Sequence, residues 1–368
     1  MSTSKFVGLD VHKNTTSVAV ADAAGGEPRY LGVIGSDDAS IRKLVRKLGA
    51  AKSLCIAYEA GPTGYGLHRL LATLGCKVIV VAPSLIPRRA GDRVKTDRRD
   101  ALQLARLLRA GELSPIEVPG PEQEALRDLS RAREDAVCSR QKARQQLASF
   151  LLRHGRRFEG KTTWSRQHRR WLQTQKFEHP AQQLAFEEYC RAVEQGDARI
   201  DRLTDALELA CEESPARETV AALQSLKGIK LVTAMALMAE LGDITRFTNP
   251  KQLMAYVGLV PSEHSSGNRV RRGGITKTGN GHARRLLTES AWNYRYPPRQ
   301  TETMTARQRG QPDTIHEIAW QAQVRLNGKF RRLTHRGKKS TVAVCAVARE
   351  LLGFVWAVAV EVKRQKAA

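Results

Sequence analysis

The chain has 368 residues, of which 41% are hydrophobic, so it is long enough for two or three folded domains and is not a disordered tail. Lys and Arg outnumber Asp and Glu by 61 to 37, which gives a formal charge of +24. A charge of this size predicts a large anionic partner, of which nucleic acid is the first candidate. The six cysteines form no CxxC pair, which argues against a zinc finger and a disulfide scaffold.

The positive charge is unevenly distributed along the chain. The net charge is +7 for residues 1–120, +1 for residues 121–220 and +16 for residues 221–368. The last third is therefore the main candidate for a surface that binds a nucleic-acid backbone, with a solvated basic face as the alternative.

The sequence favours a cytoplasmic protein without a membrane segment. The N-terminus shows no apolar stretch followed by a cleavage site, and scattered cysteines are typical of a reducing compartment. Residues 342–362 have the length of a membrane span, but Arg349 and Glu350 lie in the middle of them. We therefore expect a buried terminal helix there.

The N-terminal third predicts a mixed α/β domain over residues 1–120. Residues 5–35 alternate as strands do and predict a three-stranded meander. A helical pattern at 39–48 is followed by the strand SLCIAYEA, the helix TGYGLHRLLATLG and the strand CKVIVVAP. This order is that of a ribonuclease H-like (RuvC-like) domain, although a sugar-kinase or actin-like fold begins in a similar way.

The rest of the chain is predicted to be helical. Residues 121–217 form a helical or coiled-coil arm, divided at Pro180, in which Val193, Ile200 and Leu207 approximate a heptad stripe. A basic run in its first half is interleaved with tryptophans, which either pack on the neighbouring helix or contact nucleic acid. Residues 218–368 predict a separate, mainly helical domain that contains a loop rich in Gly, Ser and Arg.

Four carboxylates form a candidate metal site. Asp10 lies within the first strand, Glu59 ends the fourth, and Asp97 and Asp100 open the helical segment DRRDALQLARLLRAG. The i, i+3 spacing puts the last two on one helix face, and the first and fourth strands are neighbours in a ribonuclease H-like sheet. Two Mg²⁺ ions about 4 Å apart, held by such oxygen ligands, are suited to phosphodiester chemistry. Singly, each carboxylate also fits a helix start or a strand end, and Asp92 is a weaker candidate.

The segment PSEHSSGNRVRRGGITKTGNGHARRLL is a candidate nucleic-acid loop. Its glycines allow close backbone approach, and its cations suit phosphate oxygens. These cations are Arg269, Arg271, Arg272, Lys277, Arg284 and Arg285. The sharper hypothesis is that a serine here attacks phosphorus and forms a covalent protein–DNA intermediate, whereas an ordinary Ser-Gly turn is the alternative.

The motifs together resemble a known family. FVGLDVHKNTTSVAVAD, YEAGPTGYGLHRLL, KTDRRDALQLARLL, TNPKQLMAYVGLVP and SSGNRVRRGGITKTGN are similar to successive blocks of the DEDD-type transposases of the insertion-sequence one-ten family, which are bridge-RNA-guided recombinases. The blocks keep the family's order and cover nearly the whole chain apart from the helical middle. One departure concerns the turn of a helix-hairpin-helix motif, which usually reads Pro-Gly-Ile-Gly in the family. This chain has Lys230 at the position of the second glycine.

The resemblance implies a RuvC-like domain, a coiled-coil linker and a C-terminal transposase domain. By position, Asp10, Glu59, Asp97 and Asp100 match the family's metal-binding tetrad. Ser266 matches its nucleophile, with the adjacent Ser265 as the alternative. The implied partners are donor and target DNA, a non-coding guide (bridge) RNA and sister copies in a dimer or tetramer, which would join the carboxylates of one protomer to the serine of another.

We therefore expect an RNA-guided, Mg²⁺-dependent DNA transposase or recombinase that works in the bacterial cytoplasm in association with the nucleoid. A RuvC-like junction nuclease that uses metal-activated water is one alternative. A non-catalytic nucleic-acid-binding protein with a structural acidic cluster is the other.

Overall fold

The computed structural model describes residues 3–87, 96–267 and 269–367. It divides the chain into two compact units, unit 1 (Met1–Pro119) and unit 2 (Gly120–Ala368). The predicted arm and the predicted C-terminal helical domain both lie within unit 2.

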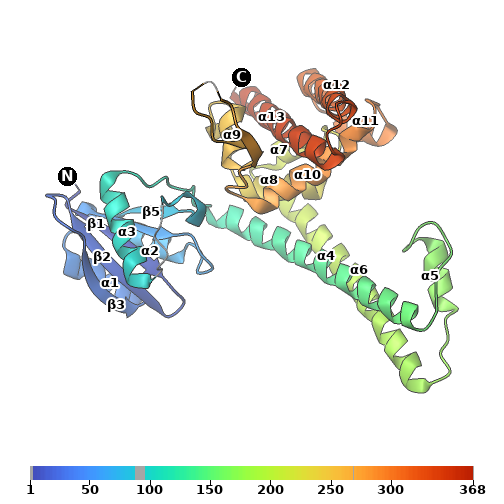
Figure 1. The fold of residues 1–368 in the computed structure, drawn as a ribbon, viewed down its shortest axis with the longest axis horizontal. Coiled ribbons are helices and arrows are strands. Elements are labelled where there is room, and N and C mark those ends of the chain that lie inside the picture. Colours follow the sequence, from blue (N-terminus) through green and yellow to red (C-terminus); the bar gives the residue numbers. More distant parts are fainter. Residues whose placement is uncertain (1–2, 88–95, 268, 368) are drawn as a thin grey trace. The chain divides into compact units, whose positions relative to one another are not determined.

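Unit 1 is built on a five-stranded sheet in the order β3-β2-β1-β4-β5 (Figure 1). Its elements are β1 (Lys5–Val11), β2 (Thr15–Asp22), β3 (Arg29–Gly35), α1 (Asp38–Leu48), β4 (Leu54–Glu59), α2 (Gly66–Thr73), β5 (Lys77–Val81) and α3 (Asp97–Ala110), with short 3₁₀ turns at Ala51–Ser53 and Pro83–Leu85. The first three strands pair antiparallel, and β1–β4 and β4–β5 pair parallel. The predicted meander and the alternation after it are confirmed.

Helices cover both faces of this sheet. Successive side chains of a strand point to opposite faces, so Val7 and Leu9 of β1 pack in one apolar cluster with α1 and α2. Gly8, between them, faces α3. The α3 side is lined by small residues, among them Ala19 and Ala101, which lets the helix lie close to the sheet.

In its described residues, unit 2 is helical apart from one short hairpin. Its elements are α4 (Pro121–Arg153), α5 (Arg166–Gln173), α6 (Pro180–Glu212), α7 (Arg217–Leu223), α8 (Leu231–Leu241), α9 (Pro250–Tyr256), β6 (Pro261–Glu263), β7 (Arg272–Ile275), α10 (Gly281–Ala291), α11 (Glu302–Gln308), α12 (Asp313–His335) and α13 (Ser340–Ala367), with 3₁₀ turns at Ile244–Arg246 and Trp292–Arg295. The mainly helical character of the C-terminal region is therefore confirmed.

The arm consists of α4 and α6, which lie side by side (Figure 1). Four of the five buried residues of α6 recur at intervals of seven, as in a heptad seam: Phe186, Val193, Ile200 and Leu207. The pairing of two long helices along one apolar stripe agrees with the predicted arm. The supercoil expected of a coiled coil stays a prediction.

The basic run and the tryptophans of the arm are largely engaged within it. Asp197 of α6 accepts hydrogen bonds from Arg140 at 2.8 Å, and from Arg144 and Arg169 at 3.1 Å. The Arg144 guanidinium also lies over the ring of Trp164, 4.5 Å from its centroid. These contacts favour the packing interpretation for this part of the basic run over direct nucleic-acid contact.

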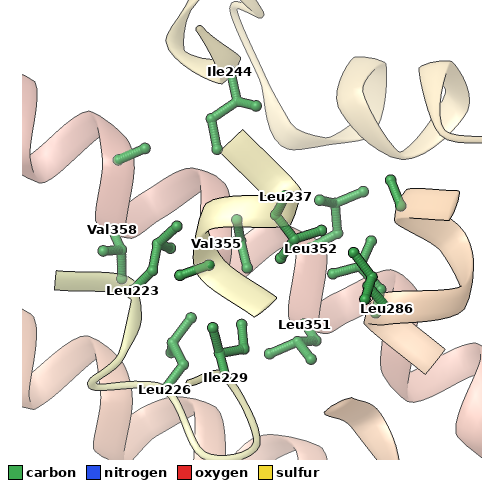
Figure 2. Packing of buried hydrophobic residues seen from close by; sticks show 14 of the residues in the cluster. Leu223, Leu226, Ile229, Leu237, Ile244, Leu286, Leu351, Leu352, Val355 and Val358 are labelled. Atoms are coloured by element: carbon green, nitrogen blue, oxygen red, sulfur yellow. The ribbon is translucent and has the colours of Figure 1, made fainter. Parts of the chain in front are cut away.

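The core of unit 2 is built around α13. Figure 2 shows Leu351, Val355 and Val358 of this helix packed among leucines from the segment around α7 and α8. By length and composition alone α13 could cross a membrane, but half of its most apolar window is buried inside the protein. Glu350, in the middle of the helix, forms ion pairs with Arg325 and Lys329 of α12 at 3.0 and 2.5 Å, which compensate its negative charge. The predicted buried terminal helix is confirmed.

Candidate active site

Two of the predicted carboxylates lie at the carboxyl ends of neighbouring parallel strands. The register pairs Leu9 with Tyr58, so Asp10 and Glu59 occupy the next position along β1 and β4. Leu9 and Tyr58 belong to the cluster on the α1 and α2 face, and alternation directs the two carboxylates to the opposite side. Because both lie at the ends of their strands, they also line a cavity of about 760 Å³ beyond the strand ends, whose other walls include α1 and α2.

The other two carboxylates lie in the first turn of α3, which Thr96 caps by accepting a hydrogen bond from the Arg99 amide at 3.3 Å. The helix reaches the sheet because β1 carries a glycine at position 8. A Cβ built there would overlap the carbonyl oxygen of Ala101 and approach the amide nitrogen of Ala105 to 2.5 Å. The missing side chain therefore brings the acidic start of α3 towards Asp10.

The structure gathers Asp10, Asp97 and His12 into one group. The His12 Nε2 atom lies 3.3 Å from Asp10 Oδ2 and 3.5 Å from Asp97 Oδ2. One potential ligand atom from each residue falls within 4.8 Å of the others, although Glu59 and Asp100 are not members of this group. Asp92 lies outside the described residues.

The electrostatics of the group suit a cation. Burial raises the pKa of Asp10, and the negative charges of Asp97 and Asp100 raise it further against the opposing influence of His12. A divalent ion would offset the negative charge that Asp97 and Asp100 place beside Asp10. The donor set of carboxylate oxygens with an imidazole nitrogen nearby therefore fits such an ion.

Sequence reasoning missed His12. It lies in the turn after β1, two positions beyond Asp10, and its side chain is half-exposed. The signal that could have found it is the Asp-Val-His spacing, since residues i and i+2 of an extended segment point to the same side. A histidine at this spacing from a predicted metal ligand belongs in the candidate site.

Replacing Gly8 by Ala tests the close approach of α3. We expect the added methyl group to destabilise the protein by about 1–3 kcal/mol, because backbone atoms of the helix must move to admit it. The same displacement would lower the DNA-cleavage activity. Gly66→Ala is the control, since a Cβ at Gly66 has no atom within 4 Å. Urea unfolding checks both variants, and equal stability of the two would contradict the packing argument.

The predicted serine loop is the connection of the β6–β7 hairpin. The strands pair antiparallel, and beyond them the Ser266 amide and carbonyl bond to the carbonyl and amide of Arg269 at 3.2 and 3.1 Å. Gly267 makes the turn in the left-handed region, with φ of 56°. Ser265, Ser266 and Arg269 are exposed, so the hairpin presents its hydroxyls to solvent.

The two serines differ in their contacts. The Ser265 hydroxyl donates to Glu263 at 2.8 Å and accepts from the Arg271 amide at 3.1 Å, so it holds the hairpin together. Within the described part of the chain, the Ser266 hydroxyl makes no side-chain hydrogen bond. Its oxygen is therefore open to a ligand.

The stem of the hairpin is firmly anchored. The Arg284 guanidinium donates to the carbonyl of Val257 at 2.8 Å and to those of Thr278 and Gly279. Gly258 and Gly279 have positive φ, and a side chain on either would overlap the facing backbone. The hairpin thus has a rigid stem and an exposed tip.

A buried carboxylate connects this stem to the arm. Glu240 of α8 accepts hydrogen bonds from Arg131 of α4 at 2.8 and 3.0 Å and from Asn280, the N-cap of α10, at 2.6 Å. Burial alone would raise the pKa of Glu240, but the hydrogen bonds and the charges of Arg131 and Arg127 together lower it. Glu240 therefore stays ionised and couples the arm to the segment that ends the hairpin.

The six predicted nucleic-acid cations fall into two groups. Arg269, Arg271, Arg272 and Lys277 are exposed on the hairpin, although Arg272 also bonds to Glu263 at 3.2 Å. Arg284 is engaged with carbonyls, and Arg285 pairs with Glu134 and Glu289 at 2.9 and 2.8 Å. Arg284 and Arg285 are half-buried, and their contacts stabilise the stem of the hairpin and α10.

The strand order, the helix positions and the carboxylates at the carboxyl ends of β1 and β4 are those expected of a ribonuclease H-like domain. Comparison with known proteins agrees. A DEDD-type transposase family model matches residues 7–155, and a model described as Transposase IS116/IS110/IS902 family matches residues 220–304. The chain belongs to this IS110-type transposase family.

Individual relatives support this assignment over the whole chain. A putative transposase, y4qE, of Sinorhizobium fredii is 48% identical over 361 residues, covering 98% of this chain and 89% of the relative. The transposase for insertion sequence element IS1533 of Leptospira borgpetersenii is 32% identical over 91% of this chain and 98% of its own. The protein is therefore a DNA transposase, and its DEDD domain implies the use of a divalent metal.

Proposed function

We propose that this transposase is guided by RNA and cuts and rejoins DNA through a serine–phosphodiester linkage. The observation that supports the serine chemistry is the exposed hairpin, which presents an open Ser266 hydroxyl among cations on a rigid stem.

Ser266 is proposed as the nucleophile in preference to Ser265. The contacts of Ser265 with Glu263 and Arg271 favour a role in holding the hairpin. Glu263 is also a weak candidate for a base acting on Ser265, because hydrogen bonds from Ser265 and Arg272 and the charge of Arg272 lower its pKa.

Asp10, Glu59, Asp97 and Asp100 are proposed to hold two Mg²⁺ ions. Oxygen ligands from four carboxylates suit this hard cation, and the raised pKa of Asp10 is consistent with a site built for positive charge. When bound, the metal activates the attacking oxygen and stabilises charge on the leaving one. His12, in contact with Asp10 and Asp97, orients these two carboxylates.

Side chains of the protein itself carry out the attack on phosphorus and bind the phosphate. The Ser266 hydroxyl gives up its proton as its oxygen attacks the scissile phosphorus, the phosphorus–oxygen bond to one DNA strand breaks, and the departing oxygen takes up a proton, so that the step consumes no net proton. The linkage keeps the free energy of the broken phosphodiester, so a new strand can reverse the step. Arg269, Arg271, Arg272 and Lys277 hold the phosphate oxygens during both steps.

The partners follow from charge and from the family. The surplus of +16 in residues 221–368 suits long nucleic-acid backbones, and the aromatic content of 5% is low for recognition by stacking. A non-coding guide RNA that pairs with donor and target DNA would then choose the sites, as base pairing does in other RNA-guided systems. We further propose a dimer or tetramer acting on the bacterial nucleoid in the cytoplasm, in which one protomer's carboxylates serve another's serine.

Reconstitution tests the proposal. The protein is purified from cells that carry its native locus, the accompanying RNA is sequenced, and the complex is incubated with Mg²⁺ and the joined ends of its element. The expected products are exchanged strands and a covalent protein–DNA species, both lost with EDTA. Metal-dependent cleavage that yields only free ends would instead favour the junction nuclease, and the absence of any metal-dependent activity would favour a binding protein.

A further inference from the structure

Unit 2 contains two basic cavities away from the serine hairpin. One, of about 500 Å³, is lined by the turn between α7 and α8 and by residues 296–307. The other, of about 900 Å³, is lined by the last turns of α12 and by Pro298. The segment Tyr296–Arg299 lines both, so this segment, the Tyr296–Arg299 ridge, is a wall that the two cavities share.

The first cavity presents exposed cations on a rigid wall. Lys227 donates to the carbonyls of Tyr296 and Pro297 at 3.4 and 3.0 Å, which fastens the turn to the ridge. Arg307 donates to the carbonyl of Ile229 at 2.7 Å. Lys230 and Arg299 line the same cavity and are exposed. Two cations thus fix the walls, and two others are open to solvent.

The second cavity has the same character. Arg331, Arg332 and His335 line it and are exposed. Two buried side chains of α12 hold the ridge that forms its wall. Asn327 donates to the backbone carbonyls of Tyr294 and Tyr296 at 3.0 Å. The side-chain oxygen of Gln323 accepts from the backbone amide of Arg299 at 3.1 Å. The ridge is therefore fixed on both sides.

Charge sets these cavities apart from other basic surfaces of the unit. Among the described residues, no Asp or Glu lines either cavity, and no ion pair involves Lys230, Arg299, Arg331 or Arg332. Arg325 on the same helix pairs with Glu350, and Arg364 pairs with Glu361 at 2.8 Å. Unpaired cations cost free energy through mutual repulsion, and a bound polyanion removes that cost.

We propose that the two cavities form one track for the phosphodiester backbone of a nucleic-acid strand. The strand crosses the Tyr296–Arg299 ridge. Its phosphates lie beside Lys230 and Arg299 in the first cavity and beside Arg331 and Arg332 in the second. A polymer with regularly spaced charges fits two separated cation pairs better than a single small anion does. Tyr296 is 54% exposed on the ridge, the Arg295 guanidinium lies 4.7 Å from its ring centroid, and the opposite face of the ring would stack on a base of the same strand. The inference rests on the DNA-directed function of the family and is independent of the serine chemistry.

Salt-dependent binding of full-length protein tests the track. Two double variants, Lys230→Gln with Arg299→Gln and Arg331→Gln with Arg332→Gln, are compared with wild type on a labelled random-sequence DNA duplex and a labelled single-stranded RNA, both without Mg²⁺. Each is expected to weaken binding ~10-fold and to reduce the slope of log K against log salt by about two, because two phosphates no longer meet a cation. The matched control, Arg325→Gln with Arg364→Gln, removes the same charge from paired sites and is expected to keep the wild-type slope.

The outcomes separate the alternatives. A loss confined to the duplex assigns the track to DNA, and a loss confined to the RNA assigns it to the guide, and both support the proposal. Slopes equal to that of the control in both double variants, or a loss at one cavity alone, would overturn it. Should a double variant unfold, Lys230→Gln and Arg332→Gln singly carry the same test. Because no strand is cut in this assay, failure of the Ser266 assignment would leave its result intact.

Discussion

Replacing Ser266 by Ala is expected to abolish the covalent protein–DNA species and to lower strand exchange on the order of 10⁴-fold or more. The substitution removes the attacking oxygen, and no neighbouring group takes its place, because the Ser265 hydroxyl is held by Glu263 and the Arg271 amide. Ser266 is exposed, so stability and nucleic-acid binding are expected to stay within the wild-type range. Denaturing gels that separate DNA-linked from free protein make the measurement.

Ser265→Ala is the matched control for that result. It removes a hydroxyl one position earlier in the same hairpin and loosens the contacts to Glu263 and Arg271, so a loss of about tenfold is expected from poorer positioning. If the covalent species persisted in Ser266→Ala and vanished in Ser265→Ala, the nucleophile would have to be reassigned to Ser265.

Replacing Asp10 by Asn is expected to lower cleavage about 10³-fold while DNA binding is retained. The amide keeps the shape of the side chain but removes the charge at the centre of the group with Asp97 and His12, and a lost metal ligand costs several kcal/mol of transition-state stabilisation. Single-turnover cleavage over a range of Mg²⁺ concentrations is the measurement, and saturation should shift to higher Mg²⁺.

Asp38→Asn is the control for this charge removal. Asp38 lines the same cavity at the start of α1 but is exposed and lies outside the group of potential ligand atoms. Its loss is expected to change cleavage less than about threefold. Wild-type cleavage by Asp10→Asn at low Mg²⁺ would show that the acidic cluster has only a structural role.

The fold of unit 1 could be predicted from the sequence because its signals are local. The alternation in residues 5–35 and the apolar strands that end at Glu59 and Val81 reflect burial on one or both faces of the sheet. Placing Asp10 beside Glu59 needed only the rule that carboxyl ends of parallel strands share an edge. The approach of α3 was harder to foresee, since Gly8 acts through the absence of a side chain against a helix some ninety residues later.

The partners of individual cations could not be predicted from the sequence. Arg284 and Arg285 stand in a basic run just as Arg271 and Arg272 do, yet three carbonyls hold the first and Glu134 holds the second. Which partner a cation meets depends on contacts between distant segments, here α10 with the end of α9 and with α4. The same limit applies to Lys230, whose neighbours across the cavity come from residues 296–307.

The chemistry at the hairpin connects these observations. A rigid stem with an exposed tip is suited to delivering a hydroxyl to a phosphate, and the Glu240 network ties that stem to the arm. Unit 1 supplies carboxylates whose mutual repulsion favours a bound cation. In the proposed mechanism unit 1 binds the metal and unit 2 makes the covalent attack, and the sister copies of the proposed oligomer bring the two together.

Peptide mapping of the protein–DNA species tests this assignment most directly. The complex is allowed to react with Mg²⁺ and the joined ends of the element, quenched with denaturant, digested with protease and nuclease, and analysed by mass spectrometry. The expected result is a nucleotide esterified to the Ser266 oxygen in the peptide that contains the hairpin tip. Cleaved DNA with no nucleotide on any serine, or with the nucleotide on a residue outside the hairpin, would contradict it.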